Sequence, residues 1–390
     1  MAQTIDQAKT GGFENVAVIG FGLIGASFAA ALRAANPSAQ VMAVDTDLAT
    51  RVEAVNRGWA TATAAPDAAE FRAFIEDSCD LVVLATPVSV VEGYLKDLAE
   101  WGYRGIITDT ASTKSRIIEM AAHTLPYPQN FVPGHPMAGS EKNGIVGARA
   151  DLFKGAYWIL CPDADTPAEH FTRLHELITG IGARVISLPR EQHDAAVAVV
   201  SHVPHFTASS LVQLAVRHAK GQDSLMRLAA GGFKDSTRIA AGSPELWCGI
   251  AFDNKDALLG GLREMQGIIG QFADALEAGD RATLTSLLAE AADARRALPA
   301  AWLPCTERLL EVRIPMEDRP GVVAEVTTIT SKVGCNIQSI EIDHVTEDSA
   351  VLSLVLTDEG DIGKLSAHLI NAGFSVSFSP LAPKEHTHVG

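Results

Sequence analysis

Short apolar runs alternate with amphipathic, alanine-rich runs in the first half of the chain. An apolar run at 15–19 is followed by a glycine-rich turn, a helical run at 26–35 and a second apolar run at 41–44. This order predicts a β-α-β unit. Because strands buried in a parallel sheet are apolar throughout, later apolar runs are predicted to extend the sheet: Leu81–Ala85, Gly105–Thr108, Phe131–Gly134 and Tyr157–Leu160. We therefore predict a doubly wound α/β domain over residues 15–188.

The pattern becomes helical after Pro189. Apolar positions at helical spacing predict a second, all-α domain over residues 189–301, with helices at Glu191–Lys220, Ser224–Gly231, Pro244–Ala278 and Arg281–Leu298. The run at 197–206 is too apolar for a solvated helix, so we place it in the core or at a dimer interface. Pro204 is expected to kink or restart the helix, since proline has no N–H to donate.

A strand-like period returns after a predicted linker at 302–308. Strands are predicted at Leu309–Ile314, Ile337–Asp343, Ser349–Leu356 and Phe374–Ser379, with helices at Val322–Val333 and Gly360–Ala372. This β-α-β-β-α-β order predicts a ferredoxin-like module over residues 309–382. The polar segments at 1–14 and 383–390 are expected to be tails.

The composition is typical of a soluble protein with more than one domain. The chain has 390 residues, of which 47% are hydrophobic and 20% are charged, and its formal net charge of -16 argues against binding to nucleic acid or to an anionic membrane. No apolar stretch approaches about 20 residues, so no transmembrane helix is expected. The polar start of the chain lacks the features of a signal peptide. Five scattered cysteines fit reduced thiols, so we expect a cytoplasmic protein without a metal site.

The glycine-rich turn matches a dinucleotide-binding motif in a context that supports it. The sequence GFGLIG lies between a predicted strand and a predicted helix, and an acidic residue follows about twenty residues later. Such glycines permit a tight turn and let the backbone approach a pyrophosphate at the helix N-terminus. The predicted cofactor-binding residues are Gly20, Gly22, Leu23, Ile24, Gly25, Asp45, Thr86 and Pro87.

Asp45 favours NAD as the cofactor. A carboxylate at the end of the second strand accepts hydrogen bonds from the ribose hydroxyls and repels a 2′-phosphate. No arginine directly follows it, although Arg51 leaves NADP open. The motif is also compatible with a flavin site, or with a glycine-rich turn that binds no dinucleotide.

Three polar segments follow the cofactor motif. Residues 109–114 (DTASTK) and 134–141 (GHPMAGSE) come after predicted strands, and ligands of an open α/β sheet bind at the carboxyl ends of its strands. A third segment, SHVPH, belongs to the predicted helical domain and contains His202 and His205. A metal site formed by these two histidines and His193 is conceivable, but no carboxylate ligand fits their spacing.

Together these motifs resemble the prephenate and arogenate dehydrogenases over residues 15–298. The matching segments are GFGLIG, DTAS, GHPMAGSEKNG, EQHD, SHVPH, GGFKDSTRI, and LW followed by DNK. The resemblance implies a Rossmann domain, an all-α dimerisation domain that makes a homodimer, and an NAD-dependent oxidative decarboxylation on the route to tyrosine. In that reaction a hydride leaves C4 of a cyclohexadienol and the C1 carboxylate departs as CO₂, so the ring becomes aromatic.

The same resemblance assigns roles to single residues. It implies that His135 accepts the proton of the C4 hydroxyl, and that Ser112 orients this hydroxyl or the imidazole. Arg238 would pair with a substrate carboxylate, and His205 would contact the substrate from the helical domain. From context alone, His135 is also compatible with a turn, Arg238 with a helix cap and His202 with a buried core histidine.

The substrate's side chain distinguishes prephenate, which has a keto group, from arogenate, which has an amino group. An arogenate-specific pocket is expected to offer a carboxylate to the ammonium, and Ser140, predicted to bind the substrate, is neutral. This favours prephenate. The neighbouring Glu141 leaves open a cyclohexadienyl dehydrogenase that accepts both.

The C-terminal module resembles an ACT-type small-molecule-binding domain over residues 309–380. The segment EDRPGV at 317–322 precedes a predicted helix, and GCNI at 334–337 follows it. The resemblance implies feedback inhibition by tyrosine, held between copies of the module by Asp318, Arg319, Pro320, Gly321, Asn336 and Ile337. A module that only supports dimerisation is also compatible with this pattern.

Two further functions are compatible with parts of the chain. The 6-phosphogluconate and 3-hydroxyacid dehydrogenases also join a Rossmann domain to helices, but they need a catalytic lysine with a nearby asparagine. Lys234 and the pair Asn254-Lys255 do not supply that arrangement. A non-enzymatic sensor of NAD and an amino acid would not need a base such as His135, so we expect an enzyme.

Overall fold

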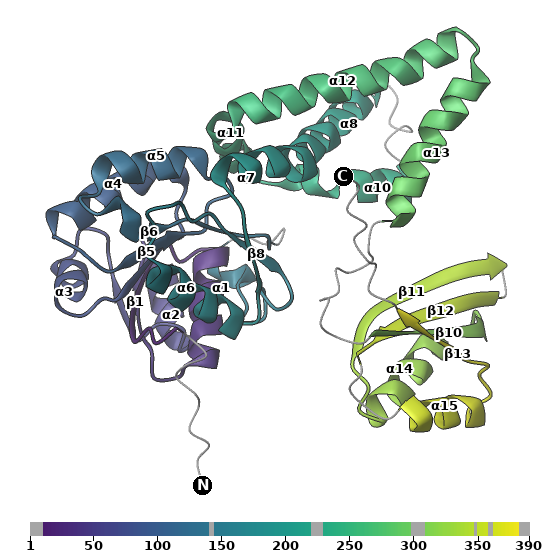
Figure 1. Ribbon diagram of the computed structural model, residues 1–390, viewed down its shortest axis with the longest axis horizontal. Coiled ribbons are helices and arrows are strands. Elements are labelled where there is room, and N and C mark those ends of the chain that lie inside the picture. The colour runs from purple at the N-terminus through teal and green to yellow at the C-terminus, as the bar shows by residue number, and fades with distance from the viewer. Residues whose placement is uncertain are drawn as a thin grey trace. The chain divides into compact units, whose positions relative to one another are not determined.

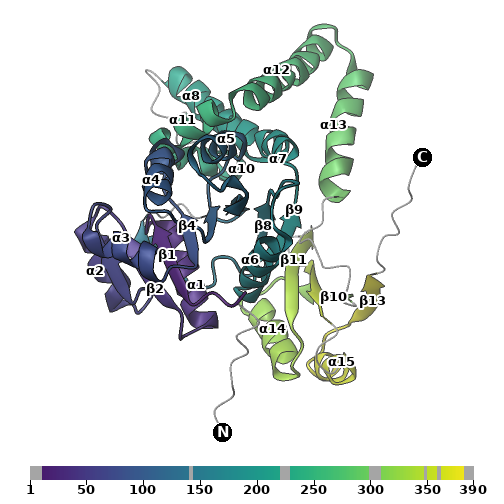
Figure 2. The same cartoon turned by 60° about the vertical axis from the view of Figure 1, so that its left-hand side comes forward.

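The computed structural model describes residues 11–139, 144–219, 229–297, 309–346, 349–357 and 362–381. The chain divides into two compact units, the first ending at Gly270 and the second starting at Gln271. Figure 1 labels the helices and strands, and Figure 2 shows the same elements from another side.

A parallel sheet lies at the centre of the first unit. Its described strands stand in the order β3-β2-β1-β4-β5-β6, with neighbours paired in parallel. Their bounds are Asn15–Ile19, Gln40–Val44, Ala62–Ala64, Leu81–Leu84, Ile106–Asp109 and Phe131–Val132 for β1 to β6. The strand order reverses between β1 and β4, so the loops after these two strands share the edge where such sheets bind ligands. This confirms the predicted doubly wound sheet, to which the structure adds the three-residue strand β3.

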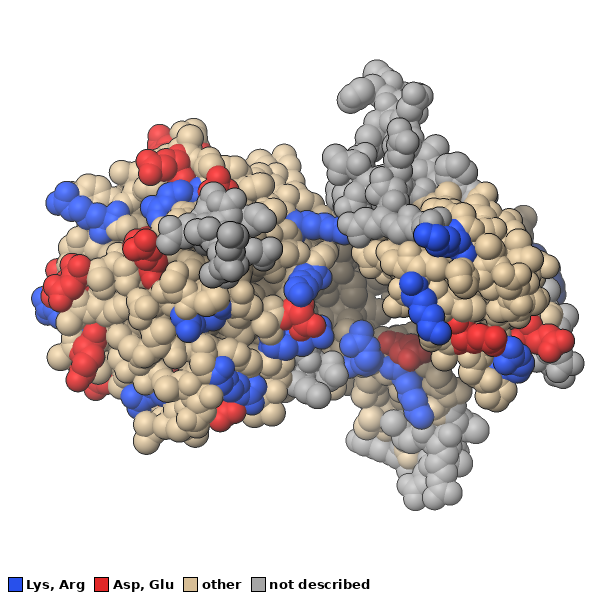
Figure 3. All heavy atoms as spheres, turned by 90° about the horizontal axis from the view of Figure 1, so that it is seen from below, with Lys and Arg blue, Asp and Glu red and all other residues tan. Residues whose placement is uncertain are grey.

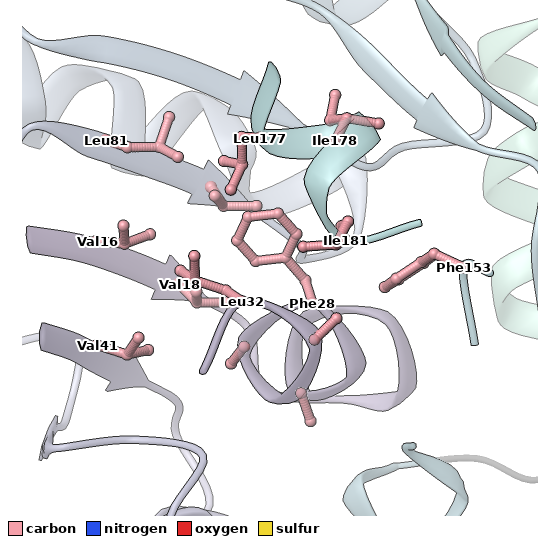
Figure 4. Close-up of a cluster of buried hydrophobic side chains, with 14 of the residues drawn as sticks. Val16, Val18, Phe28, Leu32, Val41, Leu81, Phe153, Leu177, Ile178 and Ile181 are labelled. Atoms are coloured by element: carbon pink, nitrogen blue, oxygen red, sulfur yellow. The ribbon is translucent and has the colours of Figure 1, made fainter. Parts of the chain in front are cut away.

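Helices cover both faces of this sheet because successive strand residues point to opposite sides. On one face α1 (Leu23–Ala35) and α6 (Ala168–Gly180) pack over the apolar cluster drawn in Figure 4, and α2 (Leu48–Asn56) contributes Ala54 to it. On the other face a second apolar cluster lies under α3, α4 and α5, with bounds Ala69–Asp77, Val88–Glu100 and Ser115–Thr124. The sheet is therefore fixed from both sides and presents only its edge to a ligand.

A second, small sheet follows and corrects the predicted strand at 131–134. The structure ends β6 at Val132 and starts β7 at Gly134, because Pro133 has no N–H for the ladder. β7 (Gly134–Pro136) pairs antiparallel with β8 (Tyr157–Leu160), which pairs in parallel with β9 (Arg184–Ser187). The predicted strand at Tyr157–Leu160 therefore exists but lies outside the large parallel sheet. Two single turns, η2 and η3, occupy Pro128–Asn130 and Ile145–Gly147.

The rest of the first unit is helical, as predicted. The elements are α7 (Arg190–Val197), η4 (Ala198–His202), α8 (Val203–Ala219), α10 (Gly231–Thr237), η5 (Arg238–Ala241), α11 (Pro244–Asp253) and the first part of α12 (Lys255–Glu277), which ends in the second unit. The predicted helix over 244–278 is interrupted at Asn254, and most of the predicted helix at 224–231 lies outside the described residues.

The long apolar helix does not restart at Pro204. Instead η4 is a π-helical turn, which absorbs the backbone bond that proline cannot make, and the helix continues through α8. The run Arg190–Ala219 is therefore 30 residues long and, by length and hydropathy alone, sufficient to cross a membrane. This corrects the expectation that no such segment exists. The buried His193, Asp194 and His202 on it face other parts of the first unit, and 33% of its apolar window is buried.

The second unit contains α13 (Arg281–Ala297) and a four-stranded antiparallel sheet in the order β11-β12-β10-β13. Its elements follow the chain as β10 (Leu309–Glu317), α14 (Val322–Lys332), β11 (Ile337–Thr346), β12 (Ser349–Leu356), α15 (Ile362–Asn371) and β13 (Ser377–Leu381). The helices α14 and α15 pack on one face of the sheet over an apolar cluster (Figure 1). The predicted linker at 302–308 lies outside the described residues.

Charged side chains of both signs are interspersed over the described residues on the face drawn in Figure 3. The chain carries 31 Lys and Arg against 47 Asp and Glu. This face therefore offers no continuous basic surface of the kind that follows a nucleic-acid backbone.

Candidate active site

The glycine-rich turn folds tightly where β1 enters α1. Gly20 has φ +89°, and a Cβ built on it would lie 2.6 Å from the Ala85 carbonyl oxygen. A Cβ on Gly25 would lie 2.0 Å from the Gly20 carbonyl oxygen. A Cβ on Gly22 would meet nothing within 4 Å. Two glycines are therefore required by packing, and the third leaves space above the backbone.

Asp45 holds this turn in place from the end of β2. Its Oδ2 accepts a hydrogen bond from the Phe21 amide at 2.7 Å, and its Oδ1 accepts one from the Asp47 amide at 2.9 Å. Each carboxylate oxygen keeps a further lone pair for a ligand hydroxyl. The same residue thus shapes the loop and presents an acceptor beside it.

The surroundings of the turn fit a dinucleotide. No side chain caps the N-terminus of α1, where Leu23 and Ile24 are half-buried, and such a terminus attracts a phosphate. Thr86 lies just after β4, before Pro87 at the start of α4, and its Oγ1 is buried with no hydrogen-bond partner among the described residues. The Nε of Arg51 is likewise buried without a partner among these residues. The methyl of Thr86 lies against Gly20 of the turn, so a bound cofactor could satisfy the hydroxyl beside it.

The predicted base, His135, lies inside β7 and is 8% exposed. Its Nδ1 is 2.8 Å from Nε2 of His193, and Nδ1 of His193 is 2.8 Å from Oδ1 of Asp194. The Asp194 carboxylate also accepts from the backbone amides of Lys114 and Ser115, each at 2.8 Å. A continuous chain of hydrogen bonds therefore runs from the imidazole of His135 on the small sheet to a carboxylate on α7.

This environment favours a neutral imidazole and an ionised carboxylate. Burial, followed by the positive charge of Lys114, holds the pKa of His135 well below its usual 6.5. Burial alone would raise the pKa of Asp194, but hydrogen bonds from His193 and Ser115 outweigh it and lower the value to about 2. At neutral pH His135 is therefore uncharged and Asp194 is anionic.

Two further histidines project from the helical segment. His205 stacks on Trp247 with ring centroids 3.6 Å apart and an angle of 11° between the planes, and its Nδ1 is buried without a partner among the described residues. His202 is 1% exposed, meets Trp247 edge-on, and lies 3.4 Å from the amide nitrogen of Asn254. Burial lowers the pKa of His202 to about 4. His202 is thus enclosed, whereas His205 keeps an unsatisfied ring nitrogen.

Of the three other predicted site residues, the structure describes two, Ser112 and Arg238. Ser112 is half-buried in the loop between β5 and α5, and Arg238 is an exposed residue of η5. A Cβ added to Gly242, just after η5, would be 3.4 Å from Cε1 of His205, so the two segments are in contact. Ser140 lies outside the described residues.

Comparison with known proteins decides the family. The nucleotide-binding domain of prephenate dehydrogenase matches residues 28–187, and its dimerization domain matches residues 189–290. The chain is 32% identical to the prephenate dehydrogenase of Bacillus subtilis over 352 residues, which cover 89% of this chain and 93% of that protein. The chain belongs to the prephenate dehydrogenase family.

Two other members of the family show how the likeness extends. The cyclohexadienyl dehydrogenase of Zymomonas mobilis is 34% identical over 290 residues, covering 73% of this chain and 96% of that protein. The crystal structure of the Aquifex aeolicus prephenate dehydrogenase with hydroxyphenyl propionate and NAD⁺ superposes with a TM-score of 0.69 at 27% identity. It covers 74% of this chain and 99% of that one.

No role was predicted from the sequence for His193 and Asp194, which lie in the family motif EQHD, or for the buried Lys114. His193 was considered only as a metal ligand. Among the described residues, no group of three or more His, Cys, Asp and Glu side chains is arranged to hold a metal ion. The sequence offered one sign of these residues, since the motif EQHD places polar side chains directly before an apolar helical run. Their partner could not be predicted, because His135 is 58 residues from His193 in sequence.

The predicted effector residues fall into two groups in the second unit. Asp318 to Gly321 follow the end of β10, and Gly321, with φ +87°, begins α14. The Asn336 carbonyl accepts from the Thr357 amide, and Ile337 begins β11 beside Leu356. The register pairs Glu317 with Ser349 and Leu310 with Leu356, so the two groups lie at opposite ends of the sheet. One copy of the module does not bring them together.

Proposed function

We propose that this chain is an NAD-dependent prephenate dehydrogenase, which converts prephenate to 4-hydroxyphenylpyruvate and CO₂ in tyrosine biosynthesis. The observation that carries the proposal is the buried, neutral His135 held by His193 and Asp194 in a chain whose relatives bear that name. A neutral imidazole fixed in one orientation is what proton removal from a hydroxyl requires.

The cofactor would be held by the turn at Gly20, Gly22 and Gly25, by Asp45 on the ribose, and by Thr86 after β4. NAD, when bound there, accepts the hydride from C4 of the substrate. The open space above Gly22 and the unpartnered Oγ1 of Thr86 support this assignment.

The hydrogen-bond chain sets the tautomer of the base. For Nε2 of His135 to accept a proton, Nδ1 must carry one and donate it to Nε2 of His193. His193 then donates from its own Nδ1 to the anionic Asp194, so every bond in the chain has one donor and one acceptor. Asp194 thereby stabilises the imidazolium that forms during the reaction.

The proton taken by His135 is needed again. Loss of hydride and of the hydroxyl proton leaves a ring ketone, and departure of the carboxylate as CO₂ turns this ketone into a phenolate. The phenolate oxygen stands where the hydroxyl stood, so Nε2 of His135 can return the proton and give the phenol. Because its pKa is depressed, the imidazolium gives up its proton readily, and no net proton is released.

The substrate carboxylates would be bound by Arg238 and His205, with Ser112 on the C4 hydroxyl and Ser140 near the side chain. Arg238 offers a planar fork to one carboxylate. The unpartnered Nδ1 of His205, stacked on Trp247, supports a substrate contact. A second candidate function is cyclohexadienyl dehydrogenase, which would also take arogenate; the 34% identity to the Zymomonas mobilis enzyme favours it.

The test measures NADH absorbance with NAD and either prephenate or arogenate, for the wild type and for His135→Asn. We expect turnover of prephenate that falls by about 100-fold or more in the variant. Turnover of both substrates would favour the second candidate. NAD binding without turnover of either would overturn the proposal.

We propose that the C-terminal module is an ACT-type, ferredoxin-like domain and that tyrosine binds it to inhibit the enzyme. The β-α-β-β-α-β order and the separation of the two predicted effector groups support a ligand held between two copies. Tyrosine should lower the rate at subsaturating prephenate, and Gly321→Ala, strained at φ +87°, should weaken that inhibition while leaving the uninhibited rate unchanged. Equal tyrosine sensitivity of the two proteins would count against this role.

We also propose the domain limits 15–188, 189–301 and 309–382, joined by the segment 302–308 and flanked by the tails 1–14 and 383–390. The helical domain would form a homodimer in the cytoplasm. Exposed apolar side chains on its helices support an interface: Val199, Val200, Leu211, Leu214, Phe252, Leu259, Ile268 and Ile269. Sedimentation equilibrium would report the mass of a dimer.

A further inference from the structure

A buried ion pair lies beside the predicted catalytic histidine. Lys114 and Asp109 are both 0% exposed. The Lys114 ammonium donates to the Asp109 carboxylate and, at 2.7 Å, to the carbonyl of Gly134, the residue before His135. Burying two charges is costly, and an apolar pair of similar volume often stabilises a fold equally well. The position of this pair therefore points to a role beyond stability.

The Asp109 carboxylate fixes both segments that carry predicted catalytic side chains. Its Oδ1 accepts from the Gly134 amide at 3.0 Å, one residue before His135. Its Oδ2 accepts from the Ala111 amide at 2.9 Å, one residue before Ser112. The two backbone segments are thereby tied to a single anion, which in turn is held by the lysine.

The charged and titratable groups that influence the imidazole of His135 come from several elements: Lys114 before α5, His193 and Asp194 on α7, and His202 in η4. Asp109 on β5 bonds the backbone amide of the preceding residue, Gly134. After burial, Lys114 is the strongest influence that lowers the pKa of His135. Asp194 acts in the opposite direction but is separated from the imidazole by His193. A fixed positive charge thus opposes a second one on the base.

Resting on the dehydrogenase function proposed above, we propose that Lys114 is a positioning residue. Paired with Asp109, it holds the peptide bond that carries His135 and keeps the imidazole neutral before each turnover. The neutral form is the one that accepts the hydroxyl proton. The buried ammonium therefore keeps His135 neutral, and able to accept a proton, at lower pH than without it. It also favours return of the proton to the product.

The test replaces Lys114 with methionine, which is unbranched and one heavy atom shorter and removes the charge. Two quantities are measured: the pH dependence of kcat/KM with NAD and prephenate, and the titration of the His135 ring by NMR, assigned with His135→Asn. We expect the acid-side pKa to rise by about one unit in both, since a nearby charge shifts a pKa by about 1–3 units. NAD affinity should stay unchanged. A lysine that serves only the fold would not move either titration.

A second variant protects the test against misfolding. Lys114→Met leaves Asp109 unpaired, so Asp109→Asn combined with Lys114→Met removes both charges and is expected to fold. The titration should shift in the same direction. Lys96→Met, which removes an exposed lysine paired with Glu92 on α4, is the matched control and should change neither measurement.

Either outcome is decisive. If both pKa values, that of kcat/KM and that of the His135 ring, equal the wild-type values in a folded Lys114 variant, the proposal is overturned. If the wild-type protein does not turn over prephenate, the proposed function fails, while the NMR titration of His135 still decides the role of Lys114.

Discussion

His193 shows how one side chain links two others into a working unit. It is fully buried and bonds His135 on one side and Asp194 on the other. Neither bond is required by the helix or the strand that carries these residues. Their value lies in fixing which nitrogen of His135 is free, as in other enzymes where a carboxylate orients a histidine.

Asp194→Asn should therefore lower kcat by about 100-fold or more. The amide nitrogen of asparagine does not accept from the backbone amides of Lys114 or Ser115, and the orientation of the His193 ring is no longer fixed. Steady-state kinetics with prephenate would check this, with Glu191→Gln, an exposed change on the same helix, as the control. A kcat within threefold of the wild type, in a folded protein, would rule out the assigned role.

The depressed pKa of His135 predicts a pH profile. The neutral imidazole is the active form, so activity is retained as the pH falls through 6.5 and is lost only when the pH approaches the lower pKa of the folded protein. The logarithm of kcat/KM, measured between about pH 5 and 8, should stay flat through 6.5. A decline that begins at or above pH 7 would contradict the burial of this base.

At the scale of elements, the local signals were sufficient for most of the fold. The β-α-β order around GFGLIG and the long helices follow from periodicity and glycine placement. The split of the predicted strand 131–134 was missed, although Pro133, which has no N–H for the ladder, marks it in the sequence. The bond that the Gly134 amide donates to the Asp109 carboxylate depends on tertiary packing. The contact between His135 and His193 likewise depends on tertiary packing, so the sequence predicted the base but not its support.

The cofactor turn offers a matched pair of substitutions. Gly25→Ala should destabilise the protein by about 1–3 kcal/mol even without NAD, because its Cβ would lie 2.0 Å from a backbone oxygen. Gly22→Ala should leave stability nearly unchanged, since its Cβ meets nothing within 4 Å, yet weaken NAD binding by about tenfold or more by blocking the pyrophosphate. Urea unfolding and calorimetric titration with NAD separate the two effects. Equal stability losses in both would contradict the turn geometry.

At the scale of the whole molecule, buried neutral histidines make stability depend on pH. The pKa of His202 is about 4 in the folded protein and near 6.5 when unfolded, so the unfolded chain binds more protons between these values. The contribution of His202 to the free energy of unfolding is therefore complete above pH 6.5 and is lost as the pH falls towards 4. The full difference corresponds to about 3 kcal/mol.

Urea unfolding midpoints between about pH 5 and 7.5 should therefore decrease on the acid side, and less steeply in His202→Asn. The exposed His123 on α5 supplies the control, because His123→Asn should retain the wild-type slope. Parallel curves for wild type and His202→Asn would show that His202 does not titrate as described.

The bonds from the amides of Lys114 and Ser115 to Asp194 join the first turn of α5 to α7. The same carboxylate ends the hydrogen-bond chain to His135. The contact between the dinucleotide-binding part and the helical part therefore also holds the base in position. A motion that separated α5 from α7 would break the contact that positions Asp194, and with it the support of His135. The two helices must therefore be in contact when the proton is transferred, and a crosslink between them should leave that step intact.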